Sequence, residues 1–222
     1  MHVHKPKIPH SLREFGAEIG VIVVGILIAL AGEQLVVWVH GQQEVADARE
    51  ALRSELSYDA AALKAMAAQD DCADARLSLL EAWGEGKARL NSTHLASMQN
   101  RPLLYTLKTT AWEVTTSSAI AGRMPLKDRL AFADVYDQLA NEKSHVLDER
   151  RAWDLVARYA GKAALTADEA RNLNADLGSV RVRDDDRRFN APYILRAIAR
   201  LGIKPIGPPS DRDPHQLCEQ PV

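Results

Sequence analysis

Hydrophobic residues run almost without interruption near the N-terminus of the chain. Every position from 19 to 32 is apolar or glycine, and after Glu33 and Gln34 the run resumes from 35 to 39. As a helix, these roughly 20 residues would measure about 30 Å, the hydrocarbon thickness of a bilayer. The pattern therefore predicts a transmembrane helix over residues 15–39.

Four residues of this segment are candidates for contacts inside the membrane. Glu33 and Gln34 interrupt the apolar run, and a carboxylate is costly in lipid unless it protonates, reaches the interface or faces a partner helix. Gly16 and Gly20 have the small-xxx-small spacing that lets two membrane helices approach closely. Ordinary glycine usage in membrane helices is the simpler interpretation of the glycine pair.

Charges on either side of the apolar run predict its orientation. Lys5, Lys7 and Arg13 precede the run, whereas the first charges after it are Glu44 and Asp47. Positively charged flanks stay in the cytoplasm. We therefore expect a cytoplasmic N-terminus and a periplasmic C-terminal domain, anchored in a bacterial inner membrane.

A cleaved signal peptide is the main alternative to an anchor. Ala29-Leu30-Ala31 resembles a signal peptidase site after an apolar stretch. The chain has no helix breaker at that point, and the apolar run resumes at Leu35. The pattern therefore favours an uncleaved anchor.

Beyond residue 40 the apolar positions recur at helical spacing. We expect a break at Gly41 and then an amphipathic helix, whose apolar stripe suits either a bundle or a short coiled coil. The stripe comprises Val45, Ala48, Leu52, Leu56, Leu63 and Met66. Helix is expected to continue from Cys72 to Trp83 and to end at Gly84 and Gly86.

The second half of the chain predicts further helices separated by turns. The boundary signals are Pro125, which opens a helix that runs on toward Gly161, and the capping box formed by Thr166 and Glu169. The expected elements are helices over 103–118, 125–161, 166–178 and 190–201, with a turn or short extended piece over 179–188 and Gly202 as the final stop.

Together these patterns predict an all-α protein, in which the transmembrane helix leads into an irregular helical bundle. The expected organisation is a cytoplasmic leader over 1–14, the transmembrane helix over 15–39, an extracytoplasmic all-α domain over 40–204, and a disordered Pro-rich tail over 205–222.

Charge and cysteine content add little to this picture. The formal net charge of −2 does not suggest a nucleic-acid partner, which would require a basic surface. Cys72 and Cys218 are the two cysteines, too few for a disulfide-rich scaffold. In an oxidising compartment they are candidates for a disulfide that holds the tail against the bundle, and two free thiols are the alternative.

No motif for catalysis, cofactor binding or metal binding stands out in the sequence. The strongest metal candidate is the Asp184-Asp185-Asp186 run, since carboxylates suit hard cations. Arginines flank this run on both sides, and a salt-bridged loop is therefore the favoured interpretation. We expect no cofactor and no resident metal.

The N-terminal segment resembles the anchor of a group of uncharacterised bacterial single-pass membrane proteins, which form a domain of unknown function. The matching residues are Glu18, the GILIAL core over 25–30, Gln34 and Trp38. A second, looser match comprises Trp112-Glu113, Thr116-Ser117-Ser118, the stretch from Met124 to Arg129, and Tyr136, although Ala119 replaces the group's usual glycine. The resemblance implies the membrane topology and no activity.

The leading functional hypothesis is a structural or interaction subunit of the cell envelope, which contacts the bilayer and either itself or another membrane protein. A sensor or ligand-binding module ranks second, and an enzyme third. A binding module would need a pocket between helices, and its candidate lining residues are the aromatics Trp83, Trp112, Tyr136 and Trp153, which could equally fill the core.

Overall fold

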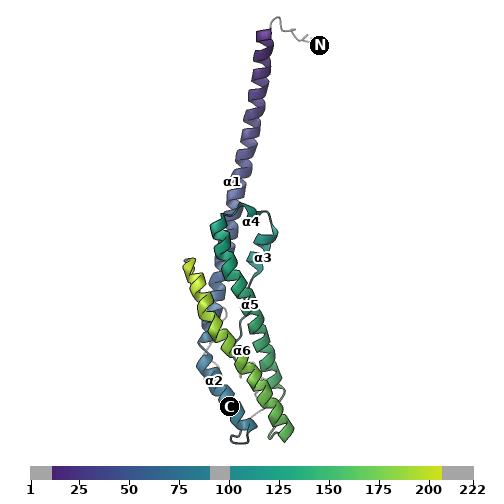
Figure 1. Ribbon diagram of the computed structural model, residues 1–222, viewed down its shortest axis with the longest axis vertical. Coiled ribbons are helices and arrows are strands. Elements are labelled where there is room, and N and C mark those ends of the chain that lie inside the picture. Colours follow the sequence, from purple (N-terminus) through teal and green to yellow (C-terminus); the bar gives the residue numbers. More distant parts are fainter. Residues whose placement is uncertain (1–11, 91–100, 207–222) are drawn as a thin grey trace. The chain divides into compact units, whose positions relative to one another are not determined.

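The computed structural model describes residues 12–90 and 101–206. Within these ranges the chain forms helices and no strand, which confirms the predicted all-α fold (Figure 1). Most of the predicted leader and tail lie outside the described residues. The helices are α1 (Leu12–Ala67), α2 (Asp70–Gly84), α3 (Thr110–Ser117), α4 (Ile120–Arg123), α5 (Leu126–Ala157) and α6 (Ala167–Arg200).

The chain divides into two compact units, Met1–Asp47 and Ala48–Val222, which we call the N-terminal unit and the helical bundle. The described part of the N-terminal unit is α1 from Leu12 to Asp47. Its apolar side chains are exposed, for example Val21 at 74% and Trp38 at 62%. Among the described residues, α1 is the one helix long and apolar enough to cross a membrane.

The expected break at Gly41 was wrong, since α1 is helical from Leu12 to Ala67. One glycine inside a helix costs only about 1 kcal/mol relative to alanine. The residues directly after Gly41, Gln42, Gln43 and Glu44, are good helix formers, and the helix continues through them. The chain first leaves the helix after Ala67, at a point where the sequence has no glycine or proline.

One part of the core of the helical bundle is the apolar stripe of α1, beside which Tyr136 of α5 donates to the Leu52 carbonyl at 3.3 Å. Leu52, Leu56 and Leu63 are completely buried, as the spacing of the stripe predicted. A second part of the core lies between α2, α5 and α6. Its members are Leu77, Leu80, Trp83, Leu90, Ala152, Trp153, Val156, Tyr159, Leu173, Leu177 and Val180.

Helices α5 and α6 form an antiparallel pair, and α2 packs against α6 (Figure 1). The boundaries of this pair follow the sequence signals. Pro125 occupies the N-cap position of α5, and Thr166 caps α6 with the capping box to Glu169 complete in both directions. Gly202, with φ of +67°, lies just beyond the end of α6.

Residues 179–188 are helical, and the prediction of a turn there was wrong. Helix α6 continues past Gly178 and through Pro192 to Arg200. Opposite charges three or four residues apart stabilise a helix, and Asp184 pairs in this way with Arg187 and Arg188. The density of charge that suggested a loop is therefore compatible with a long helix.

The prediction of a continuous helix over 103–118 was also wrong, because its helical part is confined to α3. The preceding segment is held in a non-helical conformation by the carboxamide of Gln69. This side chain donates to the Leu103 carbonyl at 3.2 Å and accepts from the Leu103 N–H at 2.8 Å. Asp59 accepts a further bond from the Lys108 N–H at 2.9 Å.

Candidate functional site

The four membrane-contact candidates lie on α1 in the N-terminal unit. The side chains of Glu33 and Gln34 are exposed. A Cβ atom added at Gly16 or Gly20 would meet no neighbour within 4 Å, so space for a second helix is open at both glycines. Intramembrane contacts at these four positions stay a prediction.

The four aromatic residues proposed to line one pocket belong to two separate parts of the bundle. Trp83 and Trp153 are members of the core cluster between α2, α5 and α6. Trp112 stacks on Tyr136, with ring centroids 5.4 Å apart and an angle of 8° between the planes. These four aromatic residues pack within the bundle. Filling of the core was the alternative to a pocket lining in the sequence analysis.

Cys72 lies in α2 and is in the disulfide-bonded state. Its predicted partner, Cys218, lies outside the described residues. The pairing of the two cysteines therefore stays a prediction.

The Asp184–Asp186 run contributes to an ionic network. Arg187, which is 1% exposed, donates from Nε to Glu149 and from Nη2 to Asp70, each at 3.0 Å, and also to Asp184. This network joins α6 to α5 and to the first turn of α2. Within the described residues no cluster of three or more His, Cys, Asp or Glu could hold a metal ion.

Burial and charge act in opposite directions within this network. Burial alone would lower the pKa of Arg187, but its three carboxylate neighbours raise it above the ordinary value. Burial raises the pKa of Glu149 to about 7, although Arg187 partly offsets this effect. The guanidinium therefore stays charged, and its positive charge is already matched by Asp70, Glu149 and Asp184.

A second buried polar group attaches α3 to α1. The carboxylate of Glu55 accepts the Ala111 N–H at 3.1 Å and the Tyr136 hydroxyl at 3.0 Å. Asp59 is completely buried, and burial together with the nearby Glu55 charge raises its pKa to about 7. Because these groups are bonded to the backbone of the same molecule, their evident role is to hold the segment from 101 to 118.

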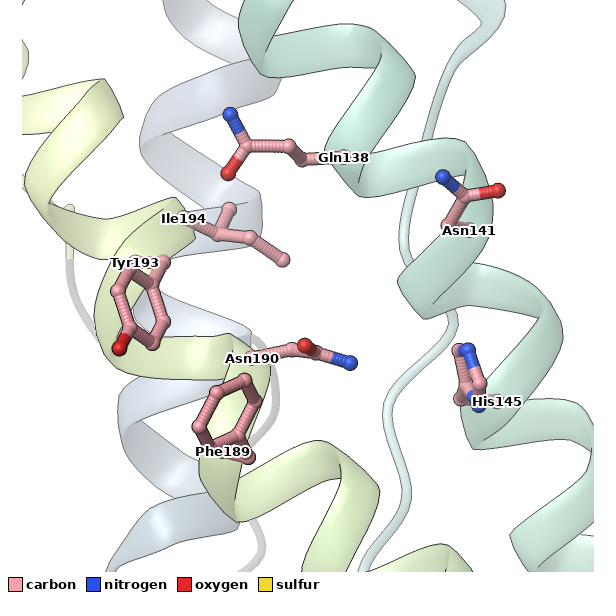
Figure 2. Close-up of a pocket in the computed structure, with 7 residues that line it drawn as sticks. All are labelled: Gln138, Asn141, His145, Phe189, Asn190, Tyr193 and Ile194. Carbon is pink, nitrogen blue, oxygen red and sulfur yellow. The ribbon is translucent and has the colours of Figure 1, made fainter.

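An open cavity of about 610 Å³ lies between α5 and α6 and is a candidate binding site. Ile194 is buried at its base, whereas Phe189 and Tyr193 are 67% and 50% exposed. Figure 2 shows side chains extending toward this space from both helices. The lining residues are Gln138, Asn141, His145, Phe189, Asn190, Tyr193 and Ile194.

Glu142, one residue from the cavity lining on α5, is 1% exposed. Burial raises its pKa to about 7, and the Asn190 carboxamide and the Arg187 charge only partly offset this effect. Although Asn190 is directed at this carboxylate, neither oxygen of Glu142 completes a hydrogen bond of normal geometry within the described structure. A buried carboxylate in this state is costly and calls for an explanation.

Sequence reasoning missed both the cavity and Glu142. One signal for the cavity was present in the sequence. Asn190 is a polar residue on the same face of α6 as Ile194. Glu142 follows Leu139 by three residues, so helical periodicity places a carboxyl group in the buried stripe of α5.

No protein-family model matches this sequence, and neither curated proteins nor solved structures match it. The resemblance to the group of uncharacterised membrane proteins stays a prediction.

Proposed function

We propose that this protein is a membrane-anchored interaction subunit of the bacterial cell envelope. In this proposal α1 spans the inner membrane, the N-terminus is cytoplasmic and the helical bundle is periplasmic. The observation that carries it is the exposed apolar surface of α1 from Ile19 to Val39, which is costly in water and stable in lipid. The Lys and Arg residues ahead of this segment support the orientation.

Within the membrane, Glu33 is the residue expected to select a partner helix. An ionisable group at membrane depth is stabilised when it faces another polar group. The open space beside Gly16 and Gly20 is compatible with a close helix contact on α1. The partner is either a second copy of this chain or a different membrane protein.

The experiment is purification of the full chain from its native membrane in a mild detergent, followed by mass spectrometry and sizing of the complex. We expect a stoichiometric partner or a homo-oligomer that Glu33→Leu disrupts. The matched control is Glu50→Leu, which makes the same change on an exposed position of α1 outside the apolar run. An unchanged complex in Glu33→Leu would refute the role of Glu33, and a soluble protein lacking residues 1–31 would refute the anchor.

A ligand-binding module is the second candidate function, and the cavity between α5 and α6 favours it. Its volume of about 610 Å³ lies within the range of small-molecule sites, about 300–1,000 Å³. Its wall combines apolar and aromatic surface with a few polar groups that can orient a ligand. A ligand-binding function of this cavity does not depend on catalytic residues.

A further inference from the structure

The cavity between α5 and α6 offers hydrogen-bond acceptors from two facing helices. Gln138 and Asn141 belong to α5, and Asn190 belongs to α6. In Figure 2 the carboxamides of Gln138 and Asn190 extend toward the space between the helices, with Ile194 between them. Each carboxamide carries a carbonyl oxygen that can accept a hydrogen bond from a ligand.

Behind this wall lies a carboxylate that has no cation of its own. Arg187, the positive charge that acts on Glu142, is already paired with Asp70, Glu149 and Asp184. The other charged groups that act on Glu142 are the carboxylates of Glu149 and Asp186, which both disfavour its ionised form. This side of the cavity is therefore deficient in positive charge.

Lysine and histidine do not supply the missing charge. Lys143 follows Glu142 directly, but its ammonium group donates to the hydroxyl of Thr109 at 3.0 Å. His145, on the cavity wall, lies 3.7 Å from a carboxylate oxygen of Asp186. Lys143 and His145 are therefore each engaged by a group other than Glu142.

The aromatic wall of the cavity already attracts a cation. The guanidinium of Arg196 lies 4.5 Å from the centroid of the Tyr193 ring. Phe189 contacts Tyr193 at 5.3 Å between centroids, and its ring is 67% exposed. Aromatic faces attract organic cations through their quadrupole and cover attached methylene groups.

We propose that the cavity between α5 and α6 binds a small organic cation, an alkylammonium ion of the primary-amine class. Glu142 is its counter-charge, and Asn190 connects the two by donating to the carboxylate and accepting from the ammonium group. Gln138 and Asn141 provide further acceptors, and the rings of Phe189 and Tyr193 cover the alkyl chain. This proposal deepens the second candidate function, on which it rests.

The test is isothermal titration calorimetry of the full-length protein in detergent with 1,5-diaminopentane, and with 1,5-pentanediol as the neutral analogue. We expect the diamine to bind and the diol to give no binding heat. Glu142→Gln keeps the shape of the side chain and removes the charge, so binding of the diamine should weaken by about tenfold to a hundredfold. Tyr193→Ala should also weaken it, by roughly threefold to tenfold.

The control variant is Asp137→Asn, which makes the same chemical change at an exposed position of α5 that does not line the cavity. It should alter the affinity by less than about twofold, because exposed charges are screened. Equal affinity for the diol, equal affinity in Glu142→Gln and Asp137→Asn, or no binding of the diamine would each overturn the proposal. Those outcomes would leave the membrane-anchored interaction role intact, because its test depends on Glu33 and not on the cavity.

Discussion

Individual polar side chains decide how the irregular parts of this bundle are held. Gln69 is the clearest case, because its carboxamide is 1% exposed and bonds both backbone groups of Leu103. It also donates to the carbonyl of Ala65 at 3.0 Å. One side chain thus links the end of α1 to a segment more than 30 residues away along the chain.

Gln69→Ala should reduce the free energy of unfolding by about 1–3 kcal/mol, because it leaves the N–H and carbonyl of Leu103 without these partners. Chemical denaturation followed by circular dichroism measures the change. Gln138→Ala is the control, since that carboxamide donates to the Asp134 carbonyl of its own helix. Equal losses in the two variants would contradict the role assigned to Gln69.

Glu142 should make the stability of the bundle depend on pH. Burial raises its pKa from 4.5 to about 7 in the folded state, so the folded protein binds more protons than the unfolded chain between these values. Stability therefore falls as the pH rises through this window, by on the order of 1–3 kcal/mol from this group. Arg187, Glu149 and Asp186 act on the same carboxyl group.

Thermal unfolding of the wild type and of Glu142→Gln, from about pH 5 to about pH 8, checks this expectation. The variant cannot ionise at this position, so its unfolding temperature should fall less across the range and exceed that of the wild type at the alkaline end. Asp59, a buried acid that does not act on Glu142, contributes to both curves and cancels in the difference. Parallel curves would show that Glu142 binds the same number of protons in the folded and unfolded protein across this window, and so that its pKa is not raised by folding.

At the scale of the elements, α6 owes its position to charge as well as to apolar contacts. Its buried stripe includes Leu177 and Val180 but also Asp184 and Arg187. Arg187 joins α6 to α5 through Glu149 and to α2 through Asp70. The ion pairs thus select one register among the three helices.

Arg187→Met should destabilise the bundle by about 3–5 kcal/mol, because it leaves buried carboxylates without a cation. Arg171→Met is the matched control on the same helix, since Arg171 pairs with Asp168 at the surface, where both side chains are at least 73% exposed. That change should cost less than about 1 kcal/mol. Denaturation midpoints measure the loss of stability in both variants. A similar loss in the two variants would contradict the stabilising role of the ionic network around Arg187.

At the scale of the whole molecule, the chain consists of an exposed apolar helix segment and a bundle with its own core. The division falls between Asp47 and Ala48, inside α1. The buried residues of α1 from Leu52 onward belong to the bundle, whereas the residues from Ile19 to Val39 expose their apolar side chains. The two parts of one helix therefore suit different solvents.

A chain lacking residues 1–39 should be soluble without detergent and should retain a cooperative thermal transition. Its unfolding temperature should lie within about 4 °C of that of the full chain, because the core residues of the bundle are all retained. Fractionation and calorimetry check both points. Aggregation of the shortened chain, with loss of the transition, would show that the bundle depends on the N-terminal unit.

The sequence by itself determined the helical fold, the apolar segment and much of the core. These features depend on local periodicity, and Leu52, Leu56 and Leu63 are buried where the spacing predicted. Local capping signals at Pro125 and Thr166 were equally informative, because a cap acts on its own helix. One error arose at 103–118, where the distant side chains of Gln69 and Asp59 hold the backbone. Another arose at 179–188, where charges that pair along one helix suggested a loop.

Only the tertiary structure decided the candidate site. Arg187 meets Asp70 and Glu149 across 117 and 38 residues of chain, and no periodicity in a single helix encodes such contacts. The cavity likewise exists because α5 and α6 pair in one register, which places Asn190 beside Glu142. Helical propensity is a property of neighbouring residues, whereas burial, charge pairing and the shape of a cavity depend on which distant segments meet.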